Sequence, residues 1–439
     1  QPRNFFGKAQ THHRRLDLVR EWTIQTLVCP TTPDKGEQGL ITKWDGNREA
    51  GFGLFIGEDG RSQLWLGDGK GEIKKLSTGA PLLAGLWYLI SGSRKADGSI
   101  TVSQIPVITA TNSRFAVASS LEGTTATVTE VCFLVPSQTD KPLILAGSVS
   151  ETLPTGRVLI GKNFNGKLDR PRVHSSALSA SEVEGQIENP RGLTLVAAWN
   201  FQAEIGANGI EHTRRVTDVS YNKLHGRTVN LPTRGVTGYN WQAKEQNFIH
   251  APTEYGAIHF HDDDLDDARW DTDFSLTVPD NLPSGLYAAR LRADGDTDHV
   301  PFYVKAKPGT EKKICFLAPT ASYMAYANDH VSATVPIAQL MVARTPVMEQ
   351  ANIVLSEHRE FGLSTYDHHS DGTGVAYSTR QRPILNMRPG FRLWLSPSLW
   401  QFNADLHLID WLTELGYDFD VVTDEDLHLR GIDAISPYR

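Results

Sequence analysis

The sequence predicts a multidomain protein that combines a β-sandwich, a small β unit and the beginning of an α/β domain. Its 439 residues exceed what one hydrophobic core normally organises. Short strand-like runs separated by turn residues occupy the chain up to about residue 238. Near the C-terminus, an apolar run is followed by an amphipathic helix and a second strand, the order of a βαβ unit. We therefore predict three domains, at residues 1–238, 239–308 and 309–439.

The composition narrows the class of protein and its partners. Apolar residues make up 40% of the chain and charged residues 21%, which is typical of a folded globular protein. The net charge of −8 and the scattered basic residues argue against a nucleic-acid partner. No apolar run reaches about 18 residues, so no membrane-spanning helix is predicted. Three widely spaced cysteines make no metal or disulfide pattern, and we expect a reducing, cytoplasmic setting. Because the chain begins at Gln1 without Met or a signal peptide, we expect that a preceding part was removed.

The first domain has the strand spacing of a two-sheet sandwich. Its alternating runs lie at residues 22–29, 53–56, 63–66 and 87–91. At residues 165–173 a Gly-x-hydrophobic-Asp strand leads into a helix for which Ser179 and Glu182 have capping-box spacing. This segment resembles the closing segment of laminin-G-like, concanavalin-like sandwiches. Such sandwiches bind carbohydrate or calcium, or serve as scaffolds. No Asp/Asn cluster at calcium-loop spacing decides between these roles.

The middle region predicts a small Ig-like β unit. Residues 274–278 and 285–291 alternate between apolar and polar, with turn residues between them, and residues 300–304 end the unit. An acidic stretch precedes it, comprising Asp262, Asp263, Asp264, Asp266 and Asp267. Those carboxylates form either a site for a hard cation or a solvated loop, and both interpretations remain open.

The third region has the pattern of a parallel α/β domain. The apolar run at 314–318 predicts a strand buried on both faces. Asn403 is placed to cap a helix whose apolar positions 408, 411, 412 and 415 form one stripe, and Gly416 to end it. A strand at 419–422 follows, and Asp424 is placed to cap the next helix. Functional groups in such domains lie beyond the carboxyl ends of the strands.

Tyr, His, Asp and Asn are concentrated in two polar segments of this region, residues 318–330 and 362–374, and a related segment follows at 382–389. These segments read APTxxYxAYxN, GLSTYDHHxDGxG and RPxLNxRP. They resemble the large subunit of N,N-dimethylformamidases, as does the order of sandwich, small β unit and glutamine-amidotransferase-like doubly wound α/β domain. The resemblance implies an iron-dependent amidohydrolase that cleaves N,N-dimethylformamide and small formamides to amine and formate.

The resemblance also implies a mononuclear iron, Fe(III), held by two tyrosines and one glutamate. By motif position the tyrosines are Tyr326 and Tyr366, and Tyr323 is the main competitor for the first place. The glutamate of the family lies in a His-Pro-Glu-Tyr motif that does not occur in these 439 residues. We therefore expect the third ligand beyond Arg439.

The chemistry of such a site is consistent with these residue types. Phenolates are hard anionic donors for Fe(III), and a Lewis acid polarises an unreactive amide carbonyl. The leaving amine needs a proton, for which His330, His368 and His369 are the candidates. Because adjacent side chains diverge, we expect at most one of His368 and His369 to face the site. The substrate-pocket candidates complete the set: Tyr323, Asn328, Asp367 and Asn386, with Asn386 and Arg388 also suited to bracing the loop.

The family's partners follow from the same resemblance: a small helical subunit, further copies of the large subunit, and a small amide substrate. The alternative function is a carbohydrate-binding sandwich attached to a non-catalytic α/β domain. This alternative predicts glycan binding, no iron and exposed aromatic residues on one sheet face. The amidohydrolase predicts a visible tyrosinate-to-iron absorption band.

Overall fold

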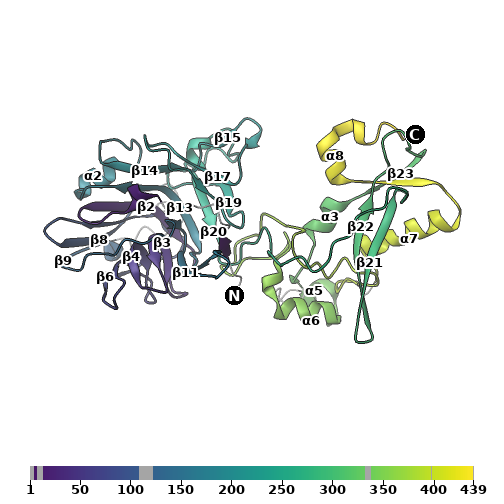
Figure 1. The fold of residues 1–439 in the computed structure, drawn as a ribbon, viewed down its shortest axis with the longest axis horizontal. Coiled ribbons are helices and arrows are strands. Elements are labelled where there is room, and N and C mark those ends of the chain that lie inside the picture. The colour runs from purple at the N-terminus through teal and green to yellow at the C-terminus, as the bar shows by residue number, and fades with distance from the viewer. Residues whose placement is uncertain (1–3, 7–12, 108–121, 332–337, 397, 439) are drawn as a thin grey trace. The chain divides into compact units, whose positions relative to one another are not determined.

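The computed structural model describes residues 4–6, 13–107, 122–331, 338–396 and 398–438. The chain divides into two compact units, Gln1–Asp264 and Leu265–Arg439. The first unit is built from strands and the second contains most of the helices, as the ribbon shows (Figure 1).

Unit 1 contains two large sheets, and their strands are listed here in spatial order. The first sheet contains β1 (Asn4–Phe6), β12 (Val158–Gly161), β11 (Ser148–Thr152), β3 (Gln38–Asp45), β4 (Ala50–Ile56), β5 (Arg61–Asp68) and β6 (Ile73–Pro81), with β10 (Ile144–Leu145) on β3. The second contains β18 (Gly226–Arg227), β17 (Arg215–Asp218), β14 (Leu195–Asn200), β13 (Gly166–His174), β2 (Trp22–Pro30), β7 (Tyr88–Arg94), β8 (Ser99–Pro106) and β9 (Ala126–Val131), with β20 (Ala257–Phe260) on β13 and β19 (Thr233–Val236) on β20.

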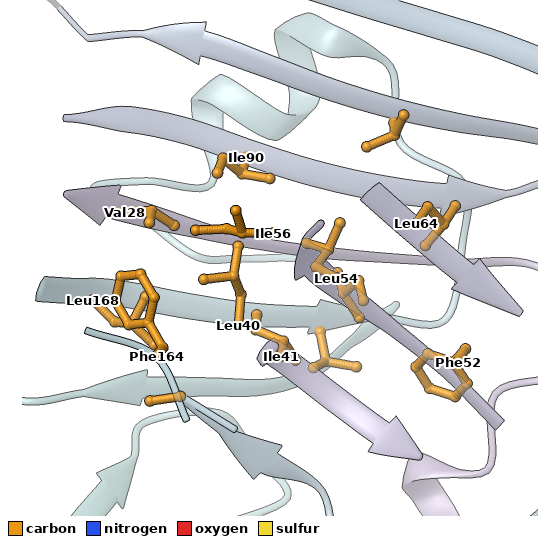
Figure 2. Packing of buried hydrophobic residues seen from close by; sticks show 14 of the residues in the cluster. Val28, Leu40, Ile41, Phe52, Leu54, Ile56, Leu64, Ile90, Phe164 and Leu168 are labelled. Carbon is orange, nitrogen blue, oxygen red and sulfur yellow. The ribbon is translucent and has the colours of Figure 1, made fainter. Parts of the chain in front are cut away.

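The hydrophobic core of unit 1 contains side chains from both sheets. Leu54 and Ile56 of β4 belong to the same buried cluster as Val28 of β2 and Ile90 of β7 (Figure 2). Alternation of side chains along each strand directs every second residue to this interior. The sandwich predicted from the sequence is confirmed, with strands at all four predicted positions.

The closing segment of the sandwich forms as predicted. Gly166 opens β13 with φ 140°, and a Cβ there would lie 2.4 Å from the carbonyl oxygen of Cys29, so only glycine fits. Leu168 enters the core. Helix α2 (Ala180–Gly185) begins at Ser179, whose hydroxyl and backbone N–H form the predicted capping box with Glu182.

The first compact unit extends past the predicted sandwich boundary at residue 238. Strand β20 pairs with β13 in the register Leu168 to Ile258, and Ile258 lies in the sandwich core. The acidic stretch begins directly after β20. Asp264 accepts a hydrogen bond from the N–H of His261 at 3.0 Å. The division into three domains stays a prediction.

Unit 2 begins with an extended segment and a hairpin. Strands β21 (Gly285–Ala293) and β22 (Asp296–Val304) pair through a two-residue turn, Asp294-Gly295, in which both residues have positive φ. The predicted strand at 274–278 is wrong, because these residues pair with no strand in the described part of the chain. The apolar side chains of this segment, such as Leu276 at 59% exposure, remain in solvent.

A parallel strand pair forms the centre of unit 2. Strand β23 (Ile314–Ala318) pairs in parallel with β24 (Phe419–Thr423). The chain between them contains α3 (Thr320–Ala325), α5 (Ala338–Val342), α6 (Gln350–Glu357), η5 (Arg359–Phe361) and α7 (Phe402–Glu414). Helix α8 (Asp424–Arg430) follows β24. The predicted strand–helix–strand order is confirmed, while the doubly wound domain stays a prediction.

Two predicted helix caps are wrong, by two residues for α7, where Gln401 precedes the helix, and by one residue for α8. Asn403 lies inside α7, fully buried, and its side chain donates to the carbonyl oxygen of Asn386 at 3.1 Å instead of capping the helix. Asp424 is the first residue of α8, and Thr423 before it forms the capping box with Asp426. Gly416 ends α7 with φ 72°, as predicted. Within the described residues, no helix combines the length and the apolar character that crossing a membrane requires.

Candidate metal centre

Tyr326 lies just beyond the carboxyl end of β23, at the end of the short helix that follows it. It caps the C-terminus of α3, with φ −98° and ψ 4°. The Nδ2 of Asn386 donates to the backbone oxygen of Tyr326 at 2.5 Å. A parallel strand followed at once by a helix thus brings this phenol to the sheet edge where α/β proteins place functional groups.

A tight turn at residues 364–367 carries Tyr366 to the end of the same helix. The backbone N–H and the hydroxyl of Thr365 both donate to the carbonyl oxygen of Ala325, at 2.9 and 3.0 Å. The N–H of Tyr366 donates to Oγ of Ser364 at 3.2 Å. Because Ala325 immediately precedes Tyr326, fixing the turn at Ala325 brings the two tyrosines together.

The two tyrosines form one stacked pair. Their ring centroids lie 3.9 Å apart with an interplanar angle of 14°. The hydrogen bond between their side chains, together with burial, raises the pKa of Tyr326 to about 12. Trp400 meets Tyr326 edge to face at 4.6 Å, and half of the Tyr366 side chain is exposed. The pair therefore presents two adjacent phenol oxygens, supported by an indole and accessible from the Tyr366 side.

Asp367 and His330 form a buried pair next to this turn. The Asp367 carboxylate lies 3.3 Å from Nδ1 of His330 and accepts the backbone N–H of His330 at 2.9 Å. The Nε2 of His330 lies 2.8 Å from the carbonyl oxygen of Leu355. Burial acts to raise the pKa of Asp367, but hydrogen bonds from His330 and Ser364 outweigh it and hold that pKa below its usual range. The carboxylate is therefore charged.

Asn328 joins the Tyr326 segment to the residues after the second motif. It is fully buried in the left-handed region at φ 59°, which asparagine tolerates better than most residues. Its Nδ2 donates to the carbonyl oxygen of Pro383 at 2.7 Å, and its Oδ1 accepts the N–H of Leu385 at 2.9 Å. Its own N–H donates to Oδ1 of Asn386 at 3.2 Å. Asn328 and Asn386, two of the four pocket candidates, thus hold the backbone of the two segments together.

Arg382 fixes the same region from inside. Its guanidinium donates to the carbonyl oxygens of Leu363, Ala327 and Thr379 at 2.9, 3.1 and 2.8 Å. Burial, partly offset by the charge of Asp367, lowers the pKa of Arg382 to about 10. Its only sequence signal is its place at the start of the RPxLNxRP segment. The segments that carry the two tyrosines are therefore tied through one buried arginine.

Tyr323 lies outside the tyrosine pair. It is 2% exposed, and its hydroxyl donates to the carboxylate of Asp405 on α7. Its ring meets Phe402 edge to face at 5.9 Å. Burial and the hydrogen bond to Asp405 raise the pKa of Tyr323. The Tyr323 phenol therefore points toward α7 and not toward Tyr326.

The adjacent histidines diverge as expected. His368 is exposed, and its carbonyl oxygen accepts a hydrogen bond from Arg359 at 3.2 Å. His369 is 6% exposed, and its N–H donates to the carbonyl oxygen of Thr373 at 2.8 Å.

Trp400, which contacts Tyr326, has no signal in the sequence, because it lies in an irregular stretch before α7 and its partner is distant along the chain.

The stacked pair has the donor chemistry of a hard-cation site. Phenol oxygens become anionic, hard ligands when they lose their protons, and a bound cation favours that loss. Without a cation, the raised pKa keeps Tyr326 protonated at neutral pH. The two adjacent oxygens of Tyr326 and Tyr366 therefore have the chemistry of ligands for a hard cation.

Comparison with known proteins divides the chain in two. Residues 6–184 match the family model described as the concanavalin A-like lectin/glucanases superfamily. Residues 233–439 match the model described as N,N-dimethylformamidase beta subunit-like, C-terminal. The second match contains all the candidate site residues.

Two curated relatives are similar over nearly all of the chain. The N,N-dimethylformamidase beta subunit of Paracoccus aminophilus is 41% identical over 95% of the chain, and that of an Alcaligenes species is 38% identical over 95%. The chain spans about half the length, 55%, of each relative. Among solved structures, a Ruminococcus gnavus sialidase module bound to sialyllactose covers 43% of this chain and 94% of its own, with 15% identity and a TM-score of 0.30.

Proposed function

Because residues 233–439 match the dimethylformamidase family and the relatives above are 38–41% identical, we propose that this chain is part of an N,N-dimethylformamidase beta subunit. Its reaction is the hydrolysis of N,N-dimethylformamide and small formamides to amine and formate. The observation that carries the proposal is the stacked pair of Tyr326 and Tyr366, because each tyrosine comes from one of the two motifs that resemble this family.

The cofactor we propose is a single iron ion, Fe(III), with Tyr326 and Tyr366 as two of its ligands. The support is the donor chemistry: two adjacent phenol oxygens that share a hydrogen bond, one of them on a half-exposed ring. When bound, such an ion supplies a Lewis acid that makes the amide carbonyl more electrophilic.

The remaining tasks fall to the side chains around the pair. Dimethylformamide has no N–H and offers few polar contacts, so aromatic surface such as the Tyr326–Trp400 contact suits its methyl groups. The leaving amine must gain a proton, for which His330, His368 and His369 are the proposed donors. Both ring nitrogens of His330 already have partners, whereas the His368 side chain is exposed.

The substitution Tyr366→Phe tests this function in the purified enzyme that contains the chain. We expect lost activity, reduced iron content and a weakened tyrosinate-to-iron absorption band, because the change removes one anionic ligand and almost no volume. Amine release, metal analysis and the visible spectrum measure these effects. Full iron and near-wild-type turnover in Tyr366→Phe would refute the proposal.

Two further tyrosine variants control for the loss of a hydroxyl. Tyr417→Phe removes a phenol of similar exposure, 48% against 50%, and should keep both iron and turnover. Tyr323→Phe removes the hydrogen bond to Asp405 and should lower stability by about 1–3 kcal/mol while keeping the absorption band. A lost band in Tyr323→Phe would mean that Tyr323, and not Tyr326, is the ligand.

The relatives are named as subunits, so we propose that the working enzyme has several chains. We also propose a cytoplasmic setting, because the three cysteines are widely spaced and form no disulfide pattern. The partners are a small helical subunit and further beta subunits, and light scattering of the assembled enzyme measures the association. The alternative, a carbohydrate-binding role for the sandwich, predicts binding to a glycan array by a protein without iron.

A further inference from the structure

We propose that Asp367 is a positioning residue, whose carboxylate, with His330 and Ser364, holds Tyr366 in register with Tyr326. This inference rests on the proposed function, because it assigns a task within the same site. It differs from the sequence-based expectation that Asp367 lines the substrate pocket.

The first support is the way the Asp367 carboxylate shapes its own turn. Oδ2 of Asp367 accepts both the N–H and the hydroxyl of Ser364, each at 2.8 Å. The same hydroxyl oxygen accepts the N–H of Tyr366 at 3.2 Å. Tyr366 lies between the two residues that form these bonds, so the backbone at Tyr366 is set by the carboxylate next to it.

The second support is the link between the two tyrosine segments. His330 follows Tyr326 by one short turn, and it meets the Asp367 carboxylate through its backbone N–H at 2.9 Å and through Nδ1 at 3.3 Å. Its Nε2 is anchored to the carbonyl oxygen of Leu355 in α6 at 2.8 Å. The Asp367–His330 pair thus connects the segment that carries Tyr326 to the turn that carries Tyr366.

A second contact, between Thr365 and Ala325, also limits the movement of the Tyr366 turn. The Tyr366 turn is already fixed on its other side, where Thr365 donates twice to the carbonyl oxygen of Ala325. Thr365 and Asp367 flank Tyr366, and both are bonded to the chain around Tyr326. One attachment on each side of Tyr366 fixes its backbone, and therefore the position from which the ring reaches its stack with Tyr326.

Burial distinguishes the Asp367 carboxylate from the phenol next to it. Asp367 and His330 are 3% and 2% exposed, whereas Tyr366 is 50% exposed. A substrate that reaches the exposed phenol does not reach the carboxylate behind it. Hydrogen-bond partners of metal ligands commonly change affinity or activity about 10–100-fold when they are substituted.

The substitution Asp367→Asn tests the inference in the complete enzyme. An amide has nearly the same volume as the carboxylate, but its NH2 group cannot accept hydrogen bonds from His330 or Ser364. We therefore expect the turn at residues 364–367 to shift and the Tyr326–Tyr366 stack to loosen. We expect a fall in kcat of about 10–100-fold with KM little changed, and a shifted or weakened tyrosinate-to-iron band. An unchanged band together with wild-type kcat overturns the inference.

Controls separate positioning from general stability and from the proposed function. Asp405→Asn removes the carboxylate that binds Tyr323 and should lower stability without moving the band. If Asp367→Asn does not fold, Ser364→Ala removes one bond to the same carboxylate and must move the band in the same direction, since an unmoved band overturns the inference. Full iron and turnover in Tyr366→Phe refute the proposed function itself, whereas a damaged Tyr366→Phe beside a normal Asp367→Asn refutes only the positioning role.

Discussion

His174 is a buried imidazole within strand β13 of the sandwich. It is fully buried, and neither ring nitrogen has a hydrogen-bond partner in the described part of the chain. Burial and the neighbouring charge of Arg172 lower the pKa of His174 to about 4. The folded protein therefore holds this side chain neutral, and charging it opposes folding.

This residue makes the stability of the sandwich depend on pH. In the unfolded chain His174 gains a proton below about pH 6.5, but in the folded chain only near pH 4, so stability is lost as pH falls through that window. Burial raises the pKa of Asp169 to about 6, and this carboxyl changes stability in the opposite direction. Wild-type measurements alone therefore mix the two effects.

The variant His174→Leu isolates the histidine. Relative to wild type, its free energy of unfolding should be about 1–2 kcal/mol higher at pH 5 than at pH 8, because leucine cannot gain a proton. Urea unfolding at both pH values measures this difference, and Asp169 cancels because both proteins contain it. A difference that does not change with pH would contradict the assignment.

Among the helix ends, the capping box at Ser179 and the glycine that ends α7 are predicted correctly, whereas the side-chain caps predicted for α7 and α8 are wrong. Gly416 was found because a glycine suits the positive φ that ends α7. Asparagine is a residue type that commonly caps helices, but the side-chain amide of Asn403 donates to the carbonyl oxygen of Asn386 in a distant segment. The stripe on α7 is also incomplete: Leu412 is buried, while Trp411 is 54% exposed. The periodicity of apolar residues predicts that a helix forms, but which of its apolar side chains are buried depends on the segments that pack against it.

Thr423 gives a test of the corrected cap. The substitution Thr423→Ala should cost about 1 kcal/mol of stability, because it leaves the N–H of Asp426 without its hydroxyl acceptor at the start of α8. Thr413→Ala is the matched control, since the Thr413 hydroxyl donates to Ile409 within α7 and its loss should be nearly neutral. Equal losses in urea unfolding would show that Thr423 is not the cap.

For the whole chain, local patterns predicted the sandwich, and the resemblance to a family selected the two tyrosines, while the contacts that join the two tyrosine segments were not visible in the sequence. Strand alternation and the closing segment depend on neighbouring residues, so they could be predicted before the structure. The bonds of Asp367 to His330 and of Thr365 to Ala325 join residues far apart along the chain. Such contacts form only when the helix and the turn pack, so single-sequence reasoning proposes the residues without their roles.

The extent of the first unit gives the last prediction. A chain of residues 1–264 should unfold cooperatively at a higher temperature than one of residues 1–238, because the shorter chain lacks β20. Without β20, Gly166 to Asp169 of β13 lose a partner strand, and Leu168 loses the cover of Ile258, both core residues. Circular dichroism during heating measures the two transitions. Equal midpoints would show that the sandwich ends at the predicted boundary, with β20 adding nothing to its stability.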